Sequence, residues 1–346
     1  MDEQSPGFPW PQASATGIGS MPGTDPAQAC RISVGEMPDL PFLPELPERG
    51  PGADITGRAA ALLIDMPAEL TAGGWKLAER PGRDLSRAAG YWSHDLDTLE
   101  EVAAGYDGGL KIQLCGPWTL AATLQLTRSL NPVLADAGAV ADLTASLAEG
   151  LAAHAADVRK RVPGAQLIVQ LDEPALPAAL AGRVPTASGL NVVPAIEESV
   201  AIQRLSEVLA AAPAATVVHC CGRAAPFPLI ARAGASAVSF ALSALPVAGP
   251  DQVAEIAEAG LGILAGALPT SSARQLAGGS RLTARQTAEA AVTLWRRTGL
   301  AAGQFTRQVV ITPECGLAGM APDAARAALA HCREAARIAP ELIEPS

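Results

Sequence analysis

Continuous apolar runs alternate with amphipathic runs along most of the chain, and this alternation limits the fold more than any other feature. Several runs are apolar and too short for ordinary helices, so we predict that they form strands. Because they are apolar throughout rather than at every second position, both faces of their sheet should be covered, as in a parallel sheet. The predicted strands are Ala15–Ser20, Leu110–Cys115, Gln166–Asp172, Thr216–Cys221, Ala237–Leu242, Gly262–Leu268 and Gln308–Thr312.

The segments between these runs include long amphipathic stretches, which we predict to be helices. They are Asp136–Arg161, Ile196–Ala211, Thr283–Arg297 and Pro322–Arg337. Alternation of strands and helices over about 320 residues predicts an α/β fold of the (βα)8 TIM-barrel type in a single domain. One strand must then be irregular, and the proline-rich segment Met37–Arg58 is our candidate for its place. A doubly wound sheet is the alternative fold.

The domain organisation follows from the same pattern. Residues 1–14 are polar and contain prolines, so we expect a disordered leader there, followed by one catalytic barrel over residues 15–346. The stretch Pro269–Leu282 is rich in small and polar residues and is expected to be a long loop near the active site.

Composition excludes several classes of protein. The formal net charge of −10 argues against nucleic acid as a partner, because phosphates require a basic surface. No apolar run reaches the roughly 18 residues of a membrane span, and the first residues lack a signal-peptide pattern. Six scattered cysteines in so long a chain are no disulfide framework. We therefore expect a reduced, cytoplasmic enzyme without a membrane partner.

Soft metal ligands follow two of the predicted strands. His219 and Cys221 are two residues apart at the end of one strand, so their side chains should share a face, whereas Cys220 should point into the core. Cys315 follows another strand, and the ends of barrel strands meet at one rim. Catalytic zinc typically has three such protein ligands. We predict a zinc site formed by His219, Cys221 and Cys315; plain burial of these small residues is the alternative.

Further motifs accompany these ligands. Gly-Ile-Gly-Ser stands at Gly17–Ser20, and Gln-Leu-Asp-Glu-Pro-Ala-Leu stands at Gln170–Leu176. In this order, with the His-x-Cys motif and the distant Cys-Gly motif, they resemble the C-terminal catalytic domain of cobalamin-independent methionine synthase from about Ala15 to Ala339. The resemblance implies a (βα)8 barrel and a methyltransferase whose zinc binds the thiol of homocysteine, which is methylated to methionine.

The resemblance also implies roles for individual residues. Ile18, Gly19 and Ser20 match the loop that holds homocysteine through its backbone. Asp172 matches the carboxylate that holds the ammonium group of the substrate, and we treat it as the catalytic carboxylate. The motif around Asp172 is also compatible with a simple helix start, since acidic groups favour helix N-termini.

A second carboxylate should help to hold the ammonium group. We select Glu45, which lies in the sequence Leu-Pro-Glu-Leu-Pro, for this role. Glu48 and Asp54 are the alternatives.

The chain also departs from the family pattern. Ala241 stands where a glutamate zinc ligand is usual, and Glu314 or a neighbouring loop carboxylate is our candidate to replace it. The segment Gly266–Thr270 lacks the histidine of the folate-dependent enzymes, and Thr123 replaces a tryptophan. These losses affect machinery for methyltetrahydrofolate, whose amine must be protonated before it leaves. We therefore expect a methyl-corrinoid, carried by a partner protein, as the donor in preference to methyltetrahydrofolate.

Two other functions stay open. A lyase resembling uroporphyrinogen decarboxylase would share the barrel, need no metal, and require arginines that face the cavity. Arg49 and Arg58 are the arginines in the relevant region. A non-catalytic barrel that only binds zinc or an amino acid is the second alternative.

Overall fold

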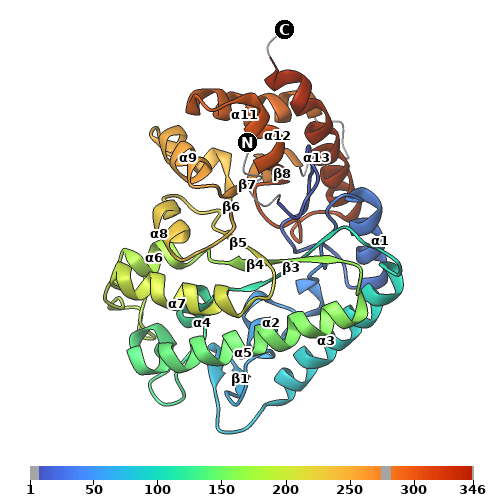
Figure 1. Cartoon of the computed structure of the whole chain (residues 1–346). Coiled ribbons are helices and arrows are strands. Elements are labelled where there is room, and N and C mark those ends of the chain that lie inside the picture. The colour runs from blue at the N-terminus through green and yellow to red at the C-terminus, as the bar shows by residue number, and fades with distance from the viewer. Residues whose placement is uncertain (1–7, 274–281, 345–346) are drawn as a thin grey trace.

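A curled parallel sheet forms the centre of the computed structural model, which describes residues 8–273 and 282–344 (Figure 1). Its six strands lie in the order of the sequence, so no point exists where the strand order reverses, as it does in a doubly wound sheet. The alternative of a doubly wound sheet is therefore wrong. The strands are β3 (Gly109–Cys115), β4 (Gln166–Asp172), β5 (Ala215–His219), β6 (Ala237–Ala241), β7 (Gly262–Leu268) and β8 (Val309–Pro313).

Two N-terminal segments continue this sheet at its edges. Thr16 donates its backbone N–H to Ile311 of β8 at 3.2 Å, and Leu43 donates to Lys111 of β3 at 2.9 Å. The predicted strand Ala15–Ser20 is therefore reduced to isolated bridges, and the second bridging segment lies within Met37–Arg58. The parallel bridges pair Ala15 with Ile311, Phe42 with Lys111, and Ser20 with Glu45.

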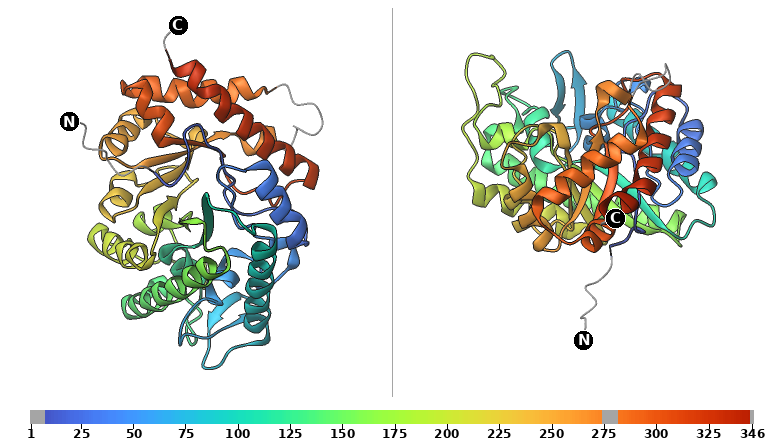
Figure 2. Two further views of the ribbon diagram at one scale, coloured as in Figure 1. Left: turned by 45° about the vertical axis from the view of Figure 1, so that its right-hand side comes forward. Right: turned by 90° about the horizontal axis from the view of Figure 1, so that it is seen from above.

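Helices cover the outer face of the sheet (Figure 2). The four predicted long helices are present as α5, α7, α11 and α13, and Thr283 caps α11 through a capping box with Gln286. The helices are α1 (Pro26–Glu36), α2 (Ile55–Ala60), α3 (Arg83–Val102), α4 (Pro117–Thr123), α5 (Ala137–Arg161), α6 (Leu176–Leu180), α7 (Glu198–Ala211), α8 (Phe227–Arg232), α9 (Gly249–Glu258), α10 (Thr270–Ala273), α11 (Ala284–Thr298), α12 (Ala302–Gln308) and α13 (Pro322–Ile343). None of the helices within the described ranges is long and apolar enough to cross a membrane.

Some shorter elements differ from the sequence prediction. A hairpin of β1 (Ala68–Thr71) and β2 (Gly74–Leu77) was not predicted. The stretch Pro269–Leu282, expected to be a loop, contains the short helix α10, and its residues 274–281 lie outside the described residues. Three 3-10 turns complete the described elements: η1 (Pro47–Arg49), η2 (Val133–Ala135) and η3 (Leu242–Ala244).

Part of the expected leader is packed against the sheet. Trp10 is only 6% exposed, and its ring stacks on Phe8 with the centroids 4.8 Å apart. Trp10 packs with one apolar residue from each of several strands, among them Ile168 and Val217. The burial of so large a ring stabilises the docked segment, so residues 8–14 differ from our expectation of disorder. Residues 1–7 lie outside the described residues.

A buried histidine joins α5 to α3. His154 is 5% exposed, and its ring lies 4.3 Å from that of Trp92. Burial, with the nearby Arg58 guanidinium, lowers the pKa of His154 to about 4. The folded protein therefore holds this ring neutral in a pH range in which the unfolded chain protonates it.

We expect this histidine to reduce stability in acid. Between pH 6.5 and 4 the unfolded state binds the extra proton, so the free energy of unfolding should fall as the pH falls, by up to about 3 kcal/mol. His154→Phe keeps the ring contact with Trp92 and removes the titration. Urea denaturation at pH 7 and pH 4.5 should show a smaller loss for the variant. Equal losses in both proteins would assign the acid sensitivity to other groups.

Candidate metal centre

Three ligand atoms meet at the carboxyl ends of β5 and β8. His219 is the last residue of β5 and Cys221 follows it, whereas Cys315 comes shortly after β8. The ligand atoms of these three side chains all lie within 4.8 Å of one another. Strands β6 and β7 separate β5 from β8 in the sheet. The curl of the sheet therefore brings the predicted ligands together.

The ring of His219 is held with one nitrogen free. Its Nδ1 lies 2.8 Å from Oγ of Ser239, the register partner of His219 on β6. Its Nε2 is buried and has no hydrogen-bond partner. A ring that donates from Nδ1 to Ser239 presents the Nε2 lone pair, which is the arrangement common in metal-binding histidines. Because an unpaired buried nitrogen is costly, a metal ion bound at Nε2 would account for its position.

The two thiols fit the same ion. Their sulfur atoms are 3.7 Å apart. Two sulfurs bound at 2.3 Å to a tetrahedral zinc would be about 3.8 Å apart. The hydrogen bond between the two thiols lowers the pKa of Cys315 and raises the pKa of Cys221. Cys220 is buried, as predicted for a core residue.

A cavity of about 370 Å³ adjoins these ligands. Eight of the residues that the sequence predicts for the site line it, although the sequence places them in five separate segments. They are Ile18, Gly19, Ser20, Glu45, Asp172, His219, Cys221 and Cys315. Of the two rivals to Glu45, Asp54 also lines the cavity, whereas Glu48 is exposed outside it.

The adjacent carboxylates of Asp172 and Glu173 have different surroundings. Asp172 ends β4, lines the cavity and accepts a hydrogen bond from Gln170 Nε2 at 2.7 Å. Burial raises the pKa of Asp172 to about 7. Glu173 instead accepts backbone hydrogen bonds from Trp118 and Thr119 at the start of α4. Glu173 therefore caps α4 and not the helix after its own motif, since α6 has no side-chain cap hydrogen bond.

Glu45 belongs to a buried ionic network. Its carboxylate lies 3.4 Å from Nε of Arg58, whose Nη1 is 2.7 Å from Asp95. Arg49 binds the same Asp95 carboxylate through two hydrogen bonds of 2.7 and 2.8 Å. Burial raises the pKa of Glu45, and the guanidinium of Arg58 opposes this shift. Both arginines thus face Asp95, and neither is among the described residues that line the cavity.

The positions that depart from the family pattern lie beside the site. Ala241 ends β6, and it is absent from the described lining of the cavity. The carboxylate of Glu314 accepts backbone hydrogen bonds from Ser243 and Thr270, at 3.3 and 3.4 Å, and lines a separate pocket of about 500 Å³ against α11. Within the described ranges, Glu314 is not grouped with the three ligands. The structure does not support Glu314 as the replacement ligand.

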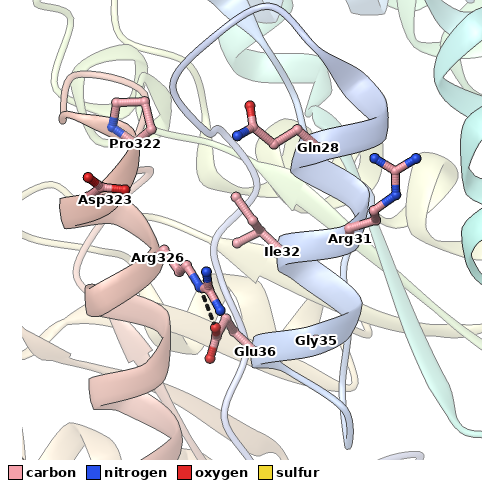
Figure 3. A pocket seen from close by; sticks show the side chains of 8 residues that line it. All are labelled: Gln28, Arg31, Ile32, Gly35, Glu36, Pro322, Asp323 and Arg326. Carbon is pink, nitrogen blue, oxygen red and sulfur yellow. Dashed lines mark hydrogen bonds and ion pairs between the residues drawn. The ribbon is translucent and has the colours of Figure 1, made fainter.

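A third pocket lies between α1 and α13 (Figure 3). Its volume is about 340 Å³. Arg326 of α13 reaches across it to Glu36 of α1, with Nε 2.7 Å from the carboxylate, and Arg333 contacts the same carboxylate at 3.2 Å. None of the predicted site residues lines this pocket, and its ion pairs dock the last helix on the first.

Sequence reasoning missed the polar residues below the cavity. Lys111 and Gln113 on β3, and Gln170 on β4, are fully buried, and Ser239 is 1% exposed. Burial lowers the pKa of Lys111 to about 8, while Asp172 and Glu45 oppose the shift. A signal was available, because these residues occupy alternate positions of otherwise apolar strands and so share one face.

A family model described as "Cobalamin-independent synthase, Catalytic domain" matches residues 133–338, more than half of the chain. A search of curated proteins found no match.

Among solved structures, a B12-independent methionine synthase from Shewanella sp. W3-18-1, in complex with selenomethionine, shares the fold. It is 15% identical, with a TM-score of 0.51 over 78% of this chain and 71% of that chain. A protein from Anabaena variabilis proposed to be a sugar phosphate isomerase/epimerase is 11% identical, with a TM-score of 0.37 over 76% of this chain and 84% of that chain. The latter similarity is too weak to support an argument.

Proposed function

The chain belongs to the family of cobalamin-independent synthase catalytic domains, and from this premise we propose that it is a zinc-dependent methyltransferase that converts homocysteine to methionine. One observation carries the proposal. The free Nε2 of His219 and two sulfur atoms converge on a cavity that is also lined by the carboxylates of Asp172 and Glu45. A soft metal site beside two carboxylates suits a substrate with both a thiol and an ammonium group.

We interpret the sheet as a (βα)8 barrel with two reduced strands. The segments that contain Ala15 and Phe42 take the places of the first two strands, because they bridge to β8 and β3 and to each other. This interpretation places the cavity at the carboxyl ends of the strands, where barrel enzymes carry their active sites.

His219, Cys221 and Cys315 would hold the zinc ion, a set of three ligands that is typical of catalytic zinc. When bound, zinc supplies the Lewis acidity that keeps a substrate thiol deprotonated near neutral pH. Ser239 orients the ring of His219. Ala241 offers no fourth protein ligand, which is compatible with a position left open for the substrate sulfur.

The remaining groups of the cavity would hold the amino-acid end of the substrate. Asp172 and Glu45 offer carboxylates to its ammonium group, and the backbone of Ile18, Gly19 and Ser20 faces its carboxylate. In the reaction, the thiolate sulfur forms a bond to the methyl carbon while the bond from that carbon to the donor breaks. The proton of the thiol is released, and no oxidant is needed.

The comparisons do not favour the corrinoid donor that the sequence predicts. The matching family is described as cobalamin-independent, and the similar solved structure is a B12-independent enzyme. We therefore propose no corrinoid partner. Parallel assays with labelled methyltetrahydrofolate and methylcobalamin distinguish the two donors.

The alternative functions have less support. A decarboxylase of the uroporphyrinogen type requires arginines that face the cavity, but Arg49 and Arg58 are both bound to Asp95.

The free thiols of the site suit a reducing compartment, and we propose the cytoplasm as the location.

Metal analysis of the purified protein tests the proposal. We expect about one zinc per chain, and X-ray absorption at the zinc edge should show one additional sulfur neighbour when homocysteine is added. Protein that contains no zinc would contradict the proposal. Zinc-loaded protein that gains no sulfur neighbour and methylates no thiol would favour the non-catalytic barrel.

A further inference from the structure

The peptide group between Ile18 and Gly19 is held from inside the sheet. The carbonyl oxygen of Ile18 accepts a hydrogen bond from Lys111 Nζ at 2.7 Å and another from Gln170 Nε2 at 3.0 Å. Both donors are fully buried, on the neighbouring strands β3 and β4. One hydrogen bond would satisfy the carbonyl of Ile18, so a second buried donor on the same carbonyl calls for a further explanation.

The same buried residues contact other parts of the cavity wall. Gln170 Nε2 also donates to Asp172 Oδ1 at 2.7 Å. Gln113 donates to the carbonyl of Leu43 at 2.6 Å, and its side chain lies 2.7 Å from the place where a Cβ on Gly19 would stand. Any larger residue at position 19 would displace Gln113, so the close approach requires glycine.

This arrangement fixes the direction of an N–H group. The described peptide bonds include no cis bond, and in a trans peptide the carbonyl and the following N–H point in opposite directions. Because the carbonyl of Ile18 points at Lys111 and Gln170, the N–H of Gly19 points away from them. Gly19 lines the cavity, so its N–H is directed to the side on which a ligand would lie. The positive charge of Lys111 strengthens the hydrogen bond that sets this direction.

We propose that Lys111 and Gln170 are positioning residues for the α-carboxylate of the substrate. They act through the peptide of Ile18 and Gly19, and they touch neither the metal ligands nor the reacting atoms. This inference rests on the proposed function, because it takes homocysteine as the ligand. The competing view is that Lys111 only balances the charges of Asp172 and Glu45 and that Gln170 only fills the interior.

Two thiols that differ only in the α-carboxylate distinguish the positioning role from a purely structural role of Lys111 and Gln170. Homocysteine carries the α-carboxylate, and 3-aminopropane-1-thiol has the same thiol and amine without it. Gln170→Met keeps the side-chain length, Lys111→Met shortens the side chain by one atom, and each removes the donor. By calorimetry on zinc-loaded protein, each variant should bind homocysteine at least about tenfold more weakly than the wild type. The affinity for 3-aminopropane-1-thiol should change by a clearly smaller factor, although Gln170→Met also removes the hydrogen bond to Asp172, and the zinc content should be unchanged.

A matched control lies at the other end of the sheet. Gln308 is also a buried glutamine, and its Nε2 donates to the backbone carbonyls of Ala257 and Leu261. Gln308→Met should leave the affinity for both thiols unchanged.

The binding measurements distinguish a failure of the positioning role from a failure of the proposed function. An equal loss for the two thiols, or no loss for either, in Lys111→Met and Gln170→Met would overturn the positioning role while the proposed function stands. Wild-type protein that binds zinc but neither thiol would overturn the proposed function, and the positioning role with it. If Lys111→Met does not fold, Gln170→Met alone decides, because it changes no charge.

Discussion

Replacing Cys221 or Cys315 with serine is expected to abolish zinc retention and thiol methylation. Each cysteine is one of only three protein ligands in the described site, and a serine oxygen is a much poorer ligand for zinc than a thiolate. We expect the zinc content to fall from about one to below about 0.1 per chain. The rate of methyl transfer should fall on the order of 10³-fold or more, because the thiolate is no longer generated.

Neither replacement should unfold the protein. Cys221 is half-buried and Cys315 is exposed, so neither contributes much to the hydrophobic core. Circular dichroism on the same samples verifies this. The loss of zinc then reports on ligation and not on the fold.

Cys220 provides the control. It is adjacent in sequence to Cys221, but it is buried in the core, and its backbone N–H bonds to Ser239. Cys220→Ala should keep the full zinc content, at a modest cost in stability. If Cys221→Ser and Cys315→Ser both retained one zinc per chain, the three-ligand site would be refuted.

The strands were predictable where the apolar run is bounded by turns. Strands β4 and β7 have the predicted bounds, since each run is continuous and ends at a charged residue or a proline. The segment Ala15–Ser20 was predicted as a strand but forms only bridges. It contains Gly17, where a Cβ would stand 2.4 Å from the ring of Phe42, and its partner segment is rich in prolines. These close contacts are tertiary, so a run of apolar residues did not reveal them.

The candidate site was predictable to the extent that its chemistry is local. His219 and Cys221 share a face because they are two residues apart on an extended segment, and that spacing is visible in the sequence. Ser239 contacts His219 only because the register of β5 and β6 makes them partners. Lys111 and Gln170 likewise reach Ile18 only across the curled sheet. Sheet register depends on packing between residues far apart in the sequence, so it cannot be predicted from the pattern of a single sequence.

Asp172→Asn is expected to weaken the binding of homocysteine on the order of 100-fold while the zinc content stays unchanged. The replacement keeps the shape of the side chain, and the retained oxygen can still accept the hydrogen bond from Gln170. It removes the charge that, in the proposed function, would face the ammonium group of homocysteine in a buried cavity, where a charge-assisted contact is strong. Calorimetry with homocysteine and metal analysis of the same preparation measure the two quantities.

Glu173→Gln is the matched control, because the carboxylates of Asp172 and Glu173 are adjacent in sequence but have different partners. Glu173 accepts hydrogen bonds from the backbone N–H groups of Trp118 and Thr119 and from the Thr119 hydroxyl. In Glu173→Gln, the amide NH₂ is itself a donor and faces these donor groups without an acceptor. The replacement should therefore lower the free energy of unfolding by about 1–3 kcal/mol. Homocysteine affinity should remain within about twofold of the wild-type value, since Glu173 does not face the cavity. If the two variants lost affinity equally, the loss would come from a shared distortion of the end of β4, and Asp172 would not be the group that holds the ammonium.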